Sequence, residues 1–248
     1  MGLKARIAAG DALLGTFVKT PHPHIVEVLA TCGLDCLVLD AEHAPFDRRD
    51  LDLCIMAGRG SIPIVVRTPD SSPESILSAL DCGAEGVLVP HVRSALVARN
   101  VAAAAQYGEG RGYAGSTRAA RYGLASMAEH RRDSAATTAV IAQIEDAEAL
   151  EEIDAIAAVG GIDALFIGRI DLTISLGCDS PDDPAVIAAC ERIISACVAA
   201  RRPVGMFLPR ASDVPQWRER GASLFLLGSD HSFVRSGAAA LRTVTGLQ

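Results

Sequence analysis

The feature that most constrains this chain is an eightfold alternation of short apolar runs with longer helical patterns. Each run is four to six residues long and continuously apolar, which is typical of strands covered on both faces. The runs are Leu14–Val18, Cys36–Asp40, Ile62–Arg67, Gly86–Pro90, Val140–Glu145, Ala164–Ile167, Pro203–Phe207 and Ser223–Leu227. Strands that alternate with helices pair in parallel through right-handed crossovers, so the pattern predicts an α/β fold.

Helical patterns fill the spaces between these runs. They are expected at His24–Thr31, Asp47–Ala57, Pro73–Asp81, Ser94–Tyr107, Ala147–Ala158, Pro184–Ala200, Ala211–Arg220 and Ser229–Thr245. Start signals agree with two of them, because a Ser-Pro pair opens the helix at Pro73 and an Asp-Pro pair opens the helix at Pro184.

Eight strand–helix units favour a closed (β/α)8 TIM barrel over a doubly wound open sheet. The open sheet usually has fewer strands, and the glycine fingerprint G-x-G-x-x-G is missing from the first strand–helix turn. We therefore expect residues 1–248 to form one barrel domain, with a long irregular loop over residues 108–139. Loops of this length inside a compact domain usually have a function.

Composition excludes several classes of protein. Hydrophobic residues make up 50% of the 248 residues, which is enough for a large core, and the net charge is −7. No basic stripe suggests a nucleic-acid partner, no apolar run reaches the ~18 residues of a membrane span, and no signal peptide is evident. The seven cysteines contain no C-x-x-C pair and are expected to be reduced. The sequence predicts a soluble, cytoplasmic protein.

Catalytic groups of a TIM barrel lie at the carboxyl ends of its strands. Ionisable or amide side chains follow six of the eight runs, although the runs themselves are almost wholly apolar. They include Lys19, Asp40, Arg67, Glu145 and Asp171. Because these strand ends meet at one rim, the residues are candidates for a single site.

Gln143 and Glu145 lie two apart on one strand, so their side chains share a face. Glu145 either caps the following helix or binds a hard divalent cation, with Asp171 after the next strand as the second carboxylate. Two carboxylates, completed by waters and substrate oxygens, describe a Mg²⁺ or Mn²⁺ site. The spacing leaves both interpretations open.

His43 and Arg67 also have two interpretations each. His43 is either a structural residue or an imidazole that its acidic neighbours Asp40 and Glu42 orient for proton transfer. Arg67 ends an apolar strand, as either a buried partner for strand-end acids or a fork for a substrate carboxylate. The other histidines, His91 among them, are interpreted as structural or exposed.

Lysine is scarce, since only Lys4 and Lys19 occur. A Schiff-base aldolase requires a lysine amine inside the barrel, and Lys19 is the only candidate. Its segment reads as a loop that opens the first helix, which makes Schiff-base chemistry the less favoured alternative.

Four motifs, taken together and in this order, resemble those of the HpcH/HpaI aldolase family. Those motifs are Asp40-Ala41-Glu42-His43-Ala44-Pro45, Val66-Arg67, Gln143-Ile144-Glu145 and Phe166-Ile167-Gly168-Arg169-Ile170-Asp171-Leu172. The resemblance extends from Gly15 to about Leu241. One departure is Gly-Arg-Ile-Asp at residues 168–171, where the family usually has Gly-Pro-Ala-Asp.

The resemblance implies a role for each matching residue. Glu145 and Asp171 match the metal ligands. Arg67 matches the arginine that holds the pyruvate oxygen, and His43 matches the base, with Asp40 as its partner.

Further matches concern the substrate pocket and the neighbouring subunit. Gln143 matches a residue that contacts the substrate or a metal-bound water, and the backbone of Ile170 and Asp171 matches the carboxylate pocket for pyruvate. Asp81 matches an acid that reaches a neighbouring subunit's site, which implies a homo-oligomer, a trimer or a hexamer. Phe207 is expected to crowd the aldehyde end of the pocket, with Leu208 beside it.

The activity implied is that of a metal-dependent, class II pyruvate aldolase. Such an enzyme cleaves a 4-hydroxy-2-oxo acid to pyruvate and an aldehyde through a pyruvate enolate stabilised by Mg²⁺, Mn²⁺ or Co²⁺. Specificity for the aldehyde is expected from the loop after the seventh strand and from the arginine-rich loop. An acyl-CoA lyase acting on the same metal barrel is the alternative, with Arg118, Arg121, Arg131 and Arg132 available for the phosphates of CoA.

Overall fold

Eight parallel strands close into a barrel in which each strand pairs with its neighbours in sequence and β8 pairs with β1. The fold is taken from a computed structural model, which describes residues 1–246. The strands are β1 Leu13–Val18, β2 Cys36–Asp40, β3 Ile64–Arg67, β4 Gly86–Val89, β5 Ala139–Ile144, β6 Ala164–Ile167, β7 Val204–Leu208 and β8 Leu224–Ser229. The expected (β/α)8 TIM barrel is confirmed, with all eight strands at the predicted positions to within one or two residues at most ends.

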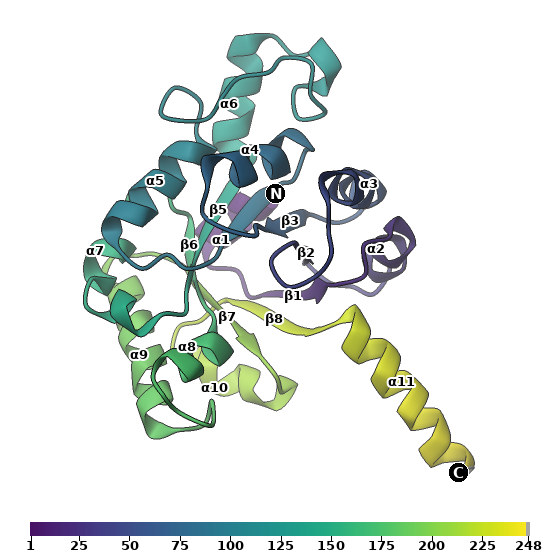
Figure 1. The fold of residues 1–248 in the computed structure, drawn as a ribbon, viewed down its shortest axis with the longest axis vertical. Coiled ribbons are helices and arrows are strands. Elements are labelled where there is room, and N and C mark those ends of the chain that lie inside the picture. Colours follow the sequence, from purple (N-terminus) through teal and green to yellow (C-terminus); the bar gives the residue numbers. More distant parts are fainter. Residues whose placement is uncertain (247–248) are drawn as a thin grey trace.

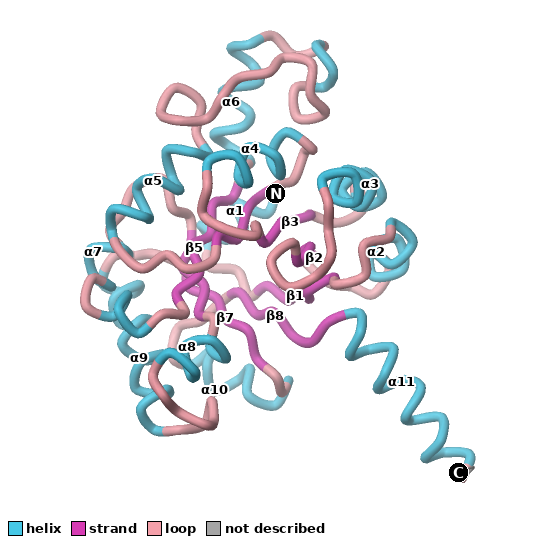
Figure 2. Tube along the Cα trace, in the orientation of Figure 1, coloured by secondary structure: helices cyan, strands magenta, loops and turns pink. Residues whose placement is uncertain are grey.

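Helices surround the ring of strands (Figures 1 and 2). They are α1 Leu3–Ala9, α2 Pro23–Ala30, α3 Arg48–Gly58, α4 Pro73–Asp81, α5 Ala95–Ala105, α6 Met127–Thr137, α7 Ile153–Ala157, α8 Arg169–Ser175, α9 Pro184–Ala199, α10 Val214–Glu219 and α11 Asp230–Thr245. Short 3-10 helices add Arg121–Gly123, Ala147–Leu150 and Ala211–Asp213. No described helix is long and apolar enough to cross a membrane.

The apolar residues of each strand divide between two cores. Along β5, Ile141 belongs to the core inside the barrel, whereas Ala142 and Ile144 belong to the core between strands and helices. This two-residue period continues into Gln143 and Glu145, which therefore face the interior at the carboxyl end of the strand. Leu3 and Ile7 of α1 join the interior core, so this unexpected helix packs into the barrel.

The structure corrects three expectations about the helices. The region 108–139 is not wholly irregular, because Ser126 and Glu129 form a capping box that starts α6. The expected helix 147–158 is split into Ala147–Leu150 and α7, and the carboxylate of Glu152 between them accepts a hydrogen bond from the Ala95 backbone. Gly168 is the N-cap of the short helix α8, where no helix was predicted.

Candidate active site

A cavity of about 350 Å³ opens at the carboxyl ends of the strands. It receives residues from β1, β3, β5, β6, β7 and β8, from the turn after β2 and from the segments that follow β1, β6 and β8. Its lining is Phe17, Lys19, His43, Arg67, Gln143, Phe166, Gly168, Arg169, Ile170, Asp171, Phe207, Gly228, Ser229 and Ser232. Six of the residues predicted from the sequence therefore face one space: His43, Arg67, Gln143, Ile170, Asp171 and Phe207.

Arg67 and Asp40 form a buried ion pair at the edge of this cavity. The Arg67 guanidinium donates from Nε and Nη2 to Asp40 Oδ1, at 3.0 and 2.8 Å. Burial alone would raise the pKa of Asp40, but the charge of Arg67, the backbone N–H of His43 and the ammonium of Lys19 together lower it below its ordinary value. Asp40 is thus a fixed anion that holds the arginine in place, the first of the two alternatives considered for Arg67.

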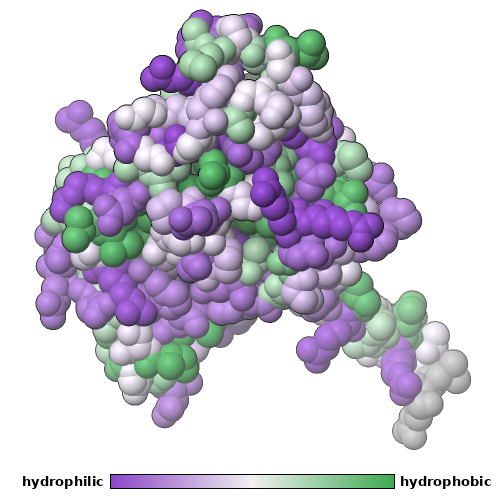
Figure 3. Space-filling view, turned by 45° about the horizontal axis from the view of Figure 1, so that its top comes forward, coloured by the Kyte–Doolittle hydropathy of each residue, from purple (hydrophilic) through white to green (hydrophobic). Residues whose placement is uncertain are grey.

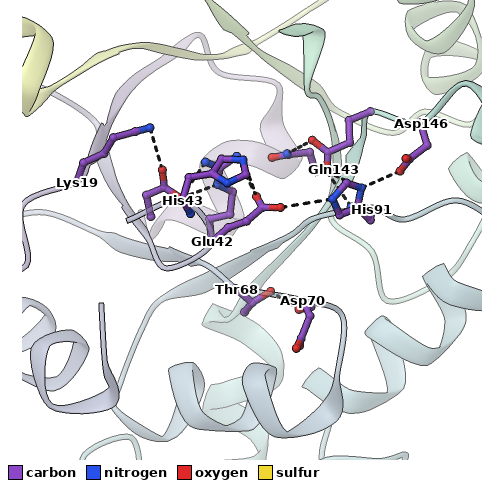
Figure 4. Close-up of polar contacts among 11 residues, drawn as sticks. Lys19, Glu42, His43, Thr68, Asp70, His91, Gln143 and Asp146 are labelled. Atoms are coloured by element: carbon purple, nitrogen blue, oxygen red, sulfur yellow. Dashed lines mark hydrogen bonds and ion pairs between the residues drawn. The ribbon is translucent and has the colours of Figure 1, made fainter. Parts of the chain in front are cut away.

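Glu42 completes the coordination of Arg67 and belongs to the same cluster. Its Oε2 lies 3.1 Å from Arg67 Nη1 and 3.7 Å from His43 Nε2, and its Oε1 lies 3.5 Å from His91 Nε2 (Figure 4). Burial raises the pKa of Glu42, and the charges of Asp40 and Asp171 act in the same direction. The sequence analysis named Glu42 as a motif residue but left it out of the catalytic set.

His91 was interpreted as structural or exposed; it is exposed, and it also lies beside Glu42 and Glu145 at the rim. Its backbone N–H donates to Glu145 Oε1 at 2.9 Å, and its Nδ1 lies 3.0 Å from Asp146 Oδ2. A φ of 54° puts His91 in the left-handed region, a strained conformation for a non-glycine residue. Its position directly after the Pro90 that follows β4 is the strand-end signal that could have identified it.

Glu145 is almost fully enclosed at this rim, with a residue exposure of 2%. The Gln143 amide donates a hydrogen bond to its Oε2, and burial raises its pKa. Neither this hydrogen bond nor the one from the His91 backbone N–H caps the helix that follows β5. The helix-cap interpretation of Glu145 is therefore not supported, and the metal-ligand interpretation stays a prediction.

His43 contacts the acids differently from expectation. Asp40 accepts a hydrogen bond from the backbone N–H of His43, at 3.1 Å, and this bond fixes the turn and not the ring. The imidazole is half exposed to the cavity and has Glu42 as its nearest acid, at 3.7 Å. Glu42, and not Asp40, therefore lies where it can orient the ring.

The acidic groups at this rim suit a divalent cation. Ligand atoms of Glu42, His91 and Glu145 lie within 4.8 Å of one another. Buried Gln143 Oε1 has no hydrogen-bond partner among the described residues, and Glu42 Oε2 has ion-pair contacts with Arg67 and His43 but no hydrogen bond there. Oxygen-rich clusters of this kind, with an imidazole nearby, are typical of Mg²⁺ and Mn²⁺ sites. Asp171 lies outside this group of three, although it lines the adjoining cavity.

Other expected residues lie away from the cavity. Asp81 forms a buried ion pair with Arg111 of the same chain, at 3.0 Å, at the end of α4 that leads into the amino end of β4. Arg118 pairs with Asp52 and Arg121 with Glu129. The arginine-rich segment therefore does not line the cavity of its own chain, and its expected contact with the aldehyde is not supported.

The two residues that were expected at the aldehyde end of the pocket face different parts of the molecule. Phe207 lines the cavity, and its ring centroid lies 6.0 Å from that of Phe17, over which Arg67 stacks at 4.6 Å. Leu208 is fully buried in the core between strands and helices. The expectation that Leu208 lies beside Phe207 in the pocket is wrong, because neighbouring strand residues point to opposite faces.

Comparison with known proteins identifies the family of the chain. A family model described as HpcH/HpaI aldolase/citrate lyase matches residues 13–236. The chain belongs to this family. It is therefore an enzyme of the aldolase and lyase class, as the motifs suggested.

Individual relatives cover nearly the whole chain. A 5-keto-4-deoxy-D-glucarate aldolase of Escherichia fergusonii is 36% identical over 242 residues, which are 96% of this chain and 94% of the relative. The crystal structure of an HpcH/HpaI aldolase/citrate lyase family protein from Burkholderia cenocepacia J2315 has a TM-score of 0.92 at 32% identity and covers 98% of both chains. The citrate synthase SbnG has a TM-score of 0.88 at 28% identity, covering 99% of this chain and 98% of its own.

Proposed function

We propose that this enzyme is a metal-dependent aldolase that cleaves a 4-hydroxy-2-oxo acid to pyruvate and an aldehyde. The observation that carries the proposal is the convergence of Arg67, His43, Gln143 and Asp171 on one cavity beside a buried acidic cluster. The aldolase names of the curated relatives support it. A 5-keto-4-deoxy-D-glucarate aldolase acts on an acid of this general kind.

The metal is proposed to bind between Glu145 and Asp171, with Mg²⁺, Mn²⁺ or Co²⁺ as the ion. Glu42 and His91 lie beside Glu145 and add negative charge and a further donor. Once bound, the ion supplies Lewis-acid stabilisation of the negative charge that develops on the 2-oxo oxygen.

Arg67 is proposed to bind the 2-oxo oxygen and to stabilise the enolate. Its position is fixed before substrate arrives, because Asp40 and Glu42 hold three of its nitrogens. A preorganised cation of this kind is effective in a site with few waters. The N–H groups of Ile170 and Asp171, in the first turn of α8, have no partners within the helix and are available to the substrate carboxylate.

His43 is proposed to accept the proton of the C4 hydroxyl. As that proton leaves, the C4–O bond becomes a carbonyl, the C3–C4 bond breaks and its electron pair forms the enolate of pyruvate. Protonation at C3 then gives pyruvate, so atoms and charge balance. Glu42 faces the ring at 3.7 Å and stabilises the imidazolium that forms.

Two alternative mechanisms receive less support. The arginines considered for CoA phosphates lie outside the cavity, and Arg118 and Arg121 are already paired. Lys19 does line the cavity, but its amine lies 3.4 Å from Asp40, whose negative charge favours the protonated ammonium over the neutral amine that Schiff-base formation requires. Borohydride trapping of a pyruvate adduct on Lys19 would favour Schiff-base chemistry.

A homo-oligomer, a trimer or a hexamer, is also proposed. The C-terminal helix α11 extends away from the barrel (Figure 1), and Asp230 is its one buried residue in the described chain. Its apolar side chains, including Phe233 and Leu241, are exposed in this single chain. Leu14 on β1, at a position that a helix usually covers, is exposed as well.

The test of the proposed function is proton exchange at C3 of pyruvate, followed by NMR in deuterated water. It requires no guess about the aldehyde. We expect exchange with Mn²⁺ or Mg²⁺, loss of exchange with EDTA, and recovery when the metal is restored. Exchange that persists in EDTA contradicts the metal-dependent mechanism.

A further inference from the structure

Lys19 is a cation in the cavity for which the mechanism above has no use. It follows β1 directly, and its side chain points across the site toward Asp40 (Figure 4). The Nζ atom lies 3.4 Å from Asp40 Oδ2, and about a third of the side chain is exposed. The amine is therefore within reach of a ligand in the cavity.

Asp40 does not depend on this contact. Its Oδ1 accepts from Arg67 Nε and Nη2 and from the His43 backbone N–H. Its Oδ2 has no hydrogen-bond partner, and the 3.4 Å separation from Lys19 is longer than a normal ammonium–carboxylate hydrogen bond. Lys19 can therefore turn toward another anion while Arg67 continues to neutralise Asp40.

The backbone at Lys19 is held by a separate acid. Asp230, at the start of α11, accepts the N–H groups of Lys19 and Thr20, at 2.8 and 2.9 Å, with one oxygen each. Asp230 is 2% exposed. Its carboxylate is thus fully used in fixing the loop, so the flexible part of Lys19 is the aliphatic stem that carries the amine into the cavity.

The other charged residues of the cavity are assigned a role or held by protein partners, although Nε and Nη1 of buried Arg169 have no hydrogen-bond partner among the described residues. Arg67 holds Asp40 and Glu42, and Arg169 donates to Asp182 and to the Pro181 carbonyl. Lys19 shares its side of the cavity with Ser229 at the end of β8 and Ser232 in the first turn of α11, whose hydroxyl groups form the capping box of that helix. This side of the cavity therefore offers an anion one weakly engaged cation and small polar neighbours.

We infer that Lys19 is a specificity-determining residue that binds a carboxylate on the aldehyde half of the substrate. The inference rests on the proposed function, and it makes the preferred substrates 2-oxo acids with a second acid group at the far end. When such a substrate binds, the ammonium leaves Asp40 Oδ2 and pairs with the substrate carboxylate. Neutral aldehydes lack this partner.

The experiment measures condensation of pyruvate with two pairs of aldehydes that differ in charge. Glyoxylate is compared with glycolaldehyde, and 4-oxobutanoate with butanal. In Lys19→Met, which keeps the stem and removes the charge, we expect the ratio of kcat/KM for the charged over the neutral aldehyde to fall about 10-fold or more, as for loss of a charged hydrogen bond. Lys19→Arg should restore part of the ratio.

Lys4→Met is the matched control, because Lys4 pairs with Asp163 and lies outside this cavity. Its ratio should equal that of the wild type. The inference is overturned if Lys19→Met lowers turnover of both aldehydes equally, which would make Lys19 a positioning residue for Asp40, or if neither ratio moves. Proton exchange at pyruvate C3 by the wild type tests the proposed function separately, since it involves no aldehyde.

Discussion

Gly168 lies so close to Glu145 that a Cβ atom added to it would sit 2.6 Å from Glu145 Oε2 and 2.8 Å from Glu145 Cβ. Real Cβ atoms do not approach other atoms this closely, so a side chain at this position must displace the carboxylate. Glu145 is thus confined by the backbone of the neighbouring strand end as well as by Gln143. The confinement explains why a glycine starts α8.

Gly168→Ala should weaken metal binding while the barrel remains folded. Displacing one ligand through its surroundings typically costs 10- to 100-fold in affinity, so we expect a loss of about that size for Mn²⁺. Titration followed by electron paramagnetic resonance measures it, with circular dichroism to check folding. Gly160→Ala is the control, because a Cβ there meets nothing within 4 Å. Unchanged Mn²⁺ affinity in Gly168→Ala would remove Glu145 from the ligand set.

Asp40→Asn should destabilise the protein because it removes the charge of the carboxylate that accepts hydrogen bonds from two nitrogens of buried Arg67, so that Glu42 must balance the guanidinium. Breaking a buried ion pair from one side typically costs about 3–5 kcal/mol. Urea denaturation measures the free energy of unfolding. The control is Asp154→Asn, which disrupts an exposed pair with Arg192 and should change stability little. Equal stability of the two variants would mean that Arg67 finds another partner.

The difference between the wild type and Asp40→Asn should depend on pH. The pKa of Asp40 is lowered in the folded protein, so its stabilising contribution is complete above the ordinary aspartate pKa of about 3.9. The contribution is lost as the pH falls from there through the lower folded-state pKa. Urea curves at pH 7 and at pH 3 should therefore show a smaller gap at the lower pH. A gap that widens on acidification would contradict the assigned charge state.

The fold could be predicted from the sequence because each strand is a short, continuously apolar run with a helix after it. That signal is local and was repeated eight times. The parts that were missed have weaker signals. The helix α1 has only seven residues, and its N-cap, Gly2, has no side chain that could form a cap. The start of α6 has a capping box, but it follows a glycine-rich stretch that is typical of a loop.

The sequence could predict which residues lie at the strand ends and which face of the strand they occupy, but not their contacts. The period of β5 correctly placed Gln143 and Glu145 on the interior face. The partners of each side chain depend on geometry across strands, which no spacing encodes. For this reason Glu42 was left out of the catalytic set, and His91 was interpreted as structural or exposed with no role at the rim. Asp40 was assigned as the partner of His43, but its hydrogen bond is with the backbone of that residue.

Phe207→Ala should change which aldehydes are accepted, because Phe207 is an apolar side chain that lines the cavity and is not one of the proposed metal ligands. A lost apolar contact is worth about 1–3 kcal/mol of discrimination, so the order of preference should shift and pyruvate KM should stay within a few-fold. Leu208→Ala is the control, since this neighbour faces the outer core and should lower stability without altering preference. Loss of pyruvate binding with an unchanged aldehyde profile would mean that the substrate lies in the reverse orientation.

The exposed apolar residues of α11 share one side of the helix. At 3.6 residues per turn, Phe233, Val234, Leu241 and Val244 fall within an arc of about 100°. The helix projects from the body of the molecule, and hydrophobic atoms are visible on its surface (Figure 3). An amphipathic helix of this kind usually has its apolar stripe buried against a partner. In the proposed homo-oligomer, the partner is a second copy of the chain.

Leu241→Asp should therefore dissociate the oligomer or shift it toward smaller species, because a carboxylate buried in an apolar contact without a counter-charge is costly. Sedimentation velocity of the wild type and the variant at equal concentration measures this. Ala239→Asp introduces the same charge on the opposite side of the helix, about 180° from the middle of the apolar arc, and should leave the assembly intact. If both variants sediment as the wild type does, α11 does not form the contact between subunits. If the wild type itself is a monomer, the homo-oligomer proposal is wrong.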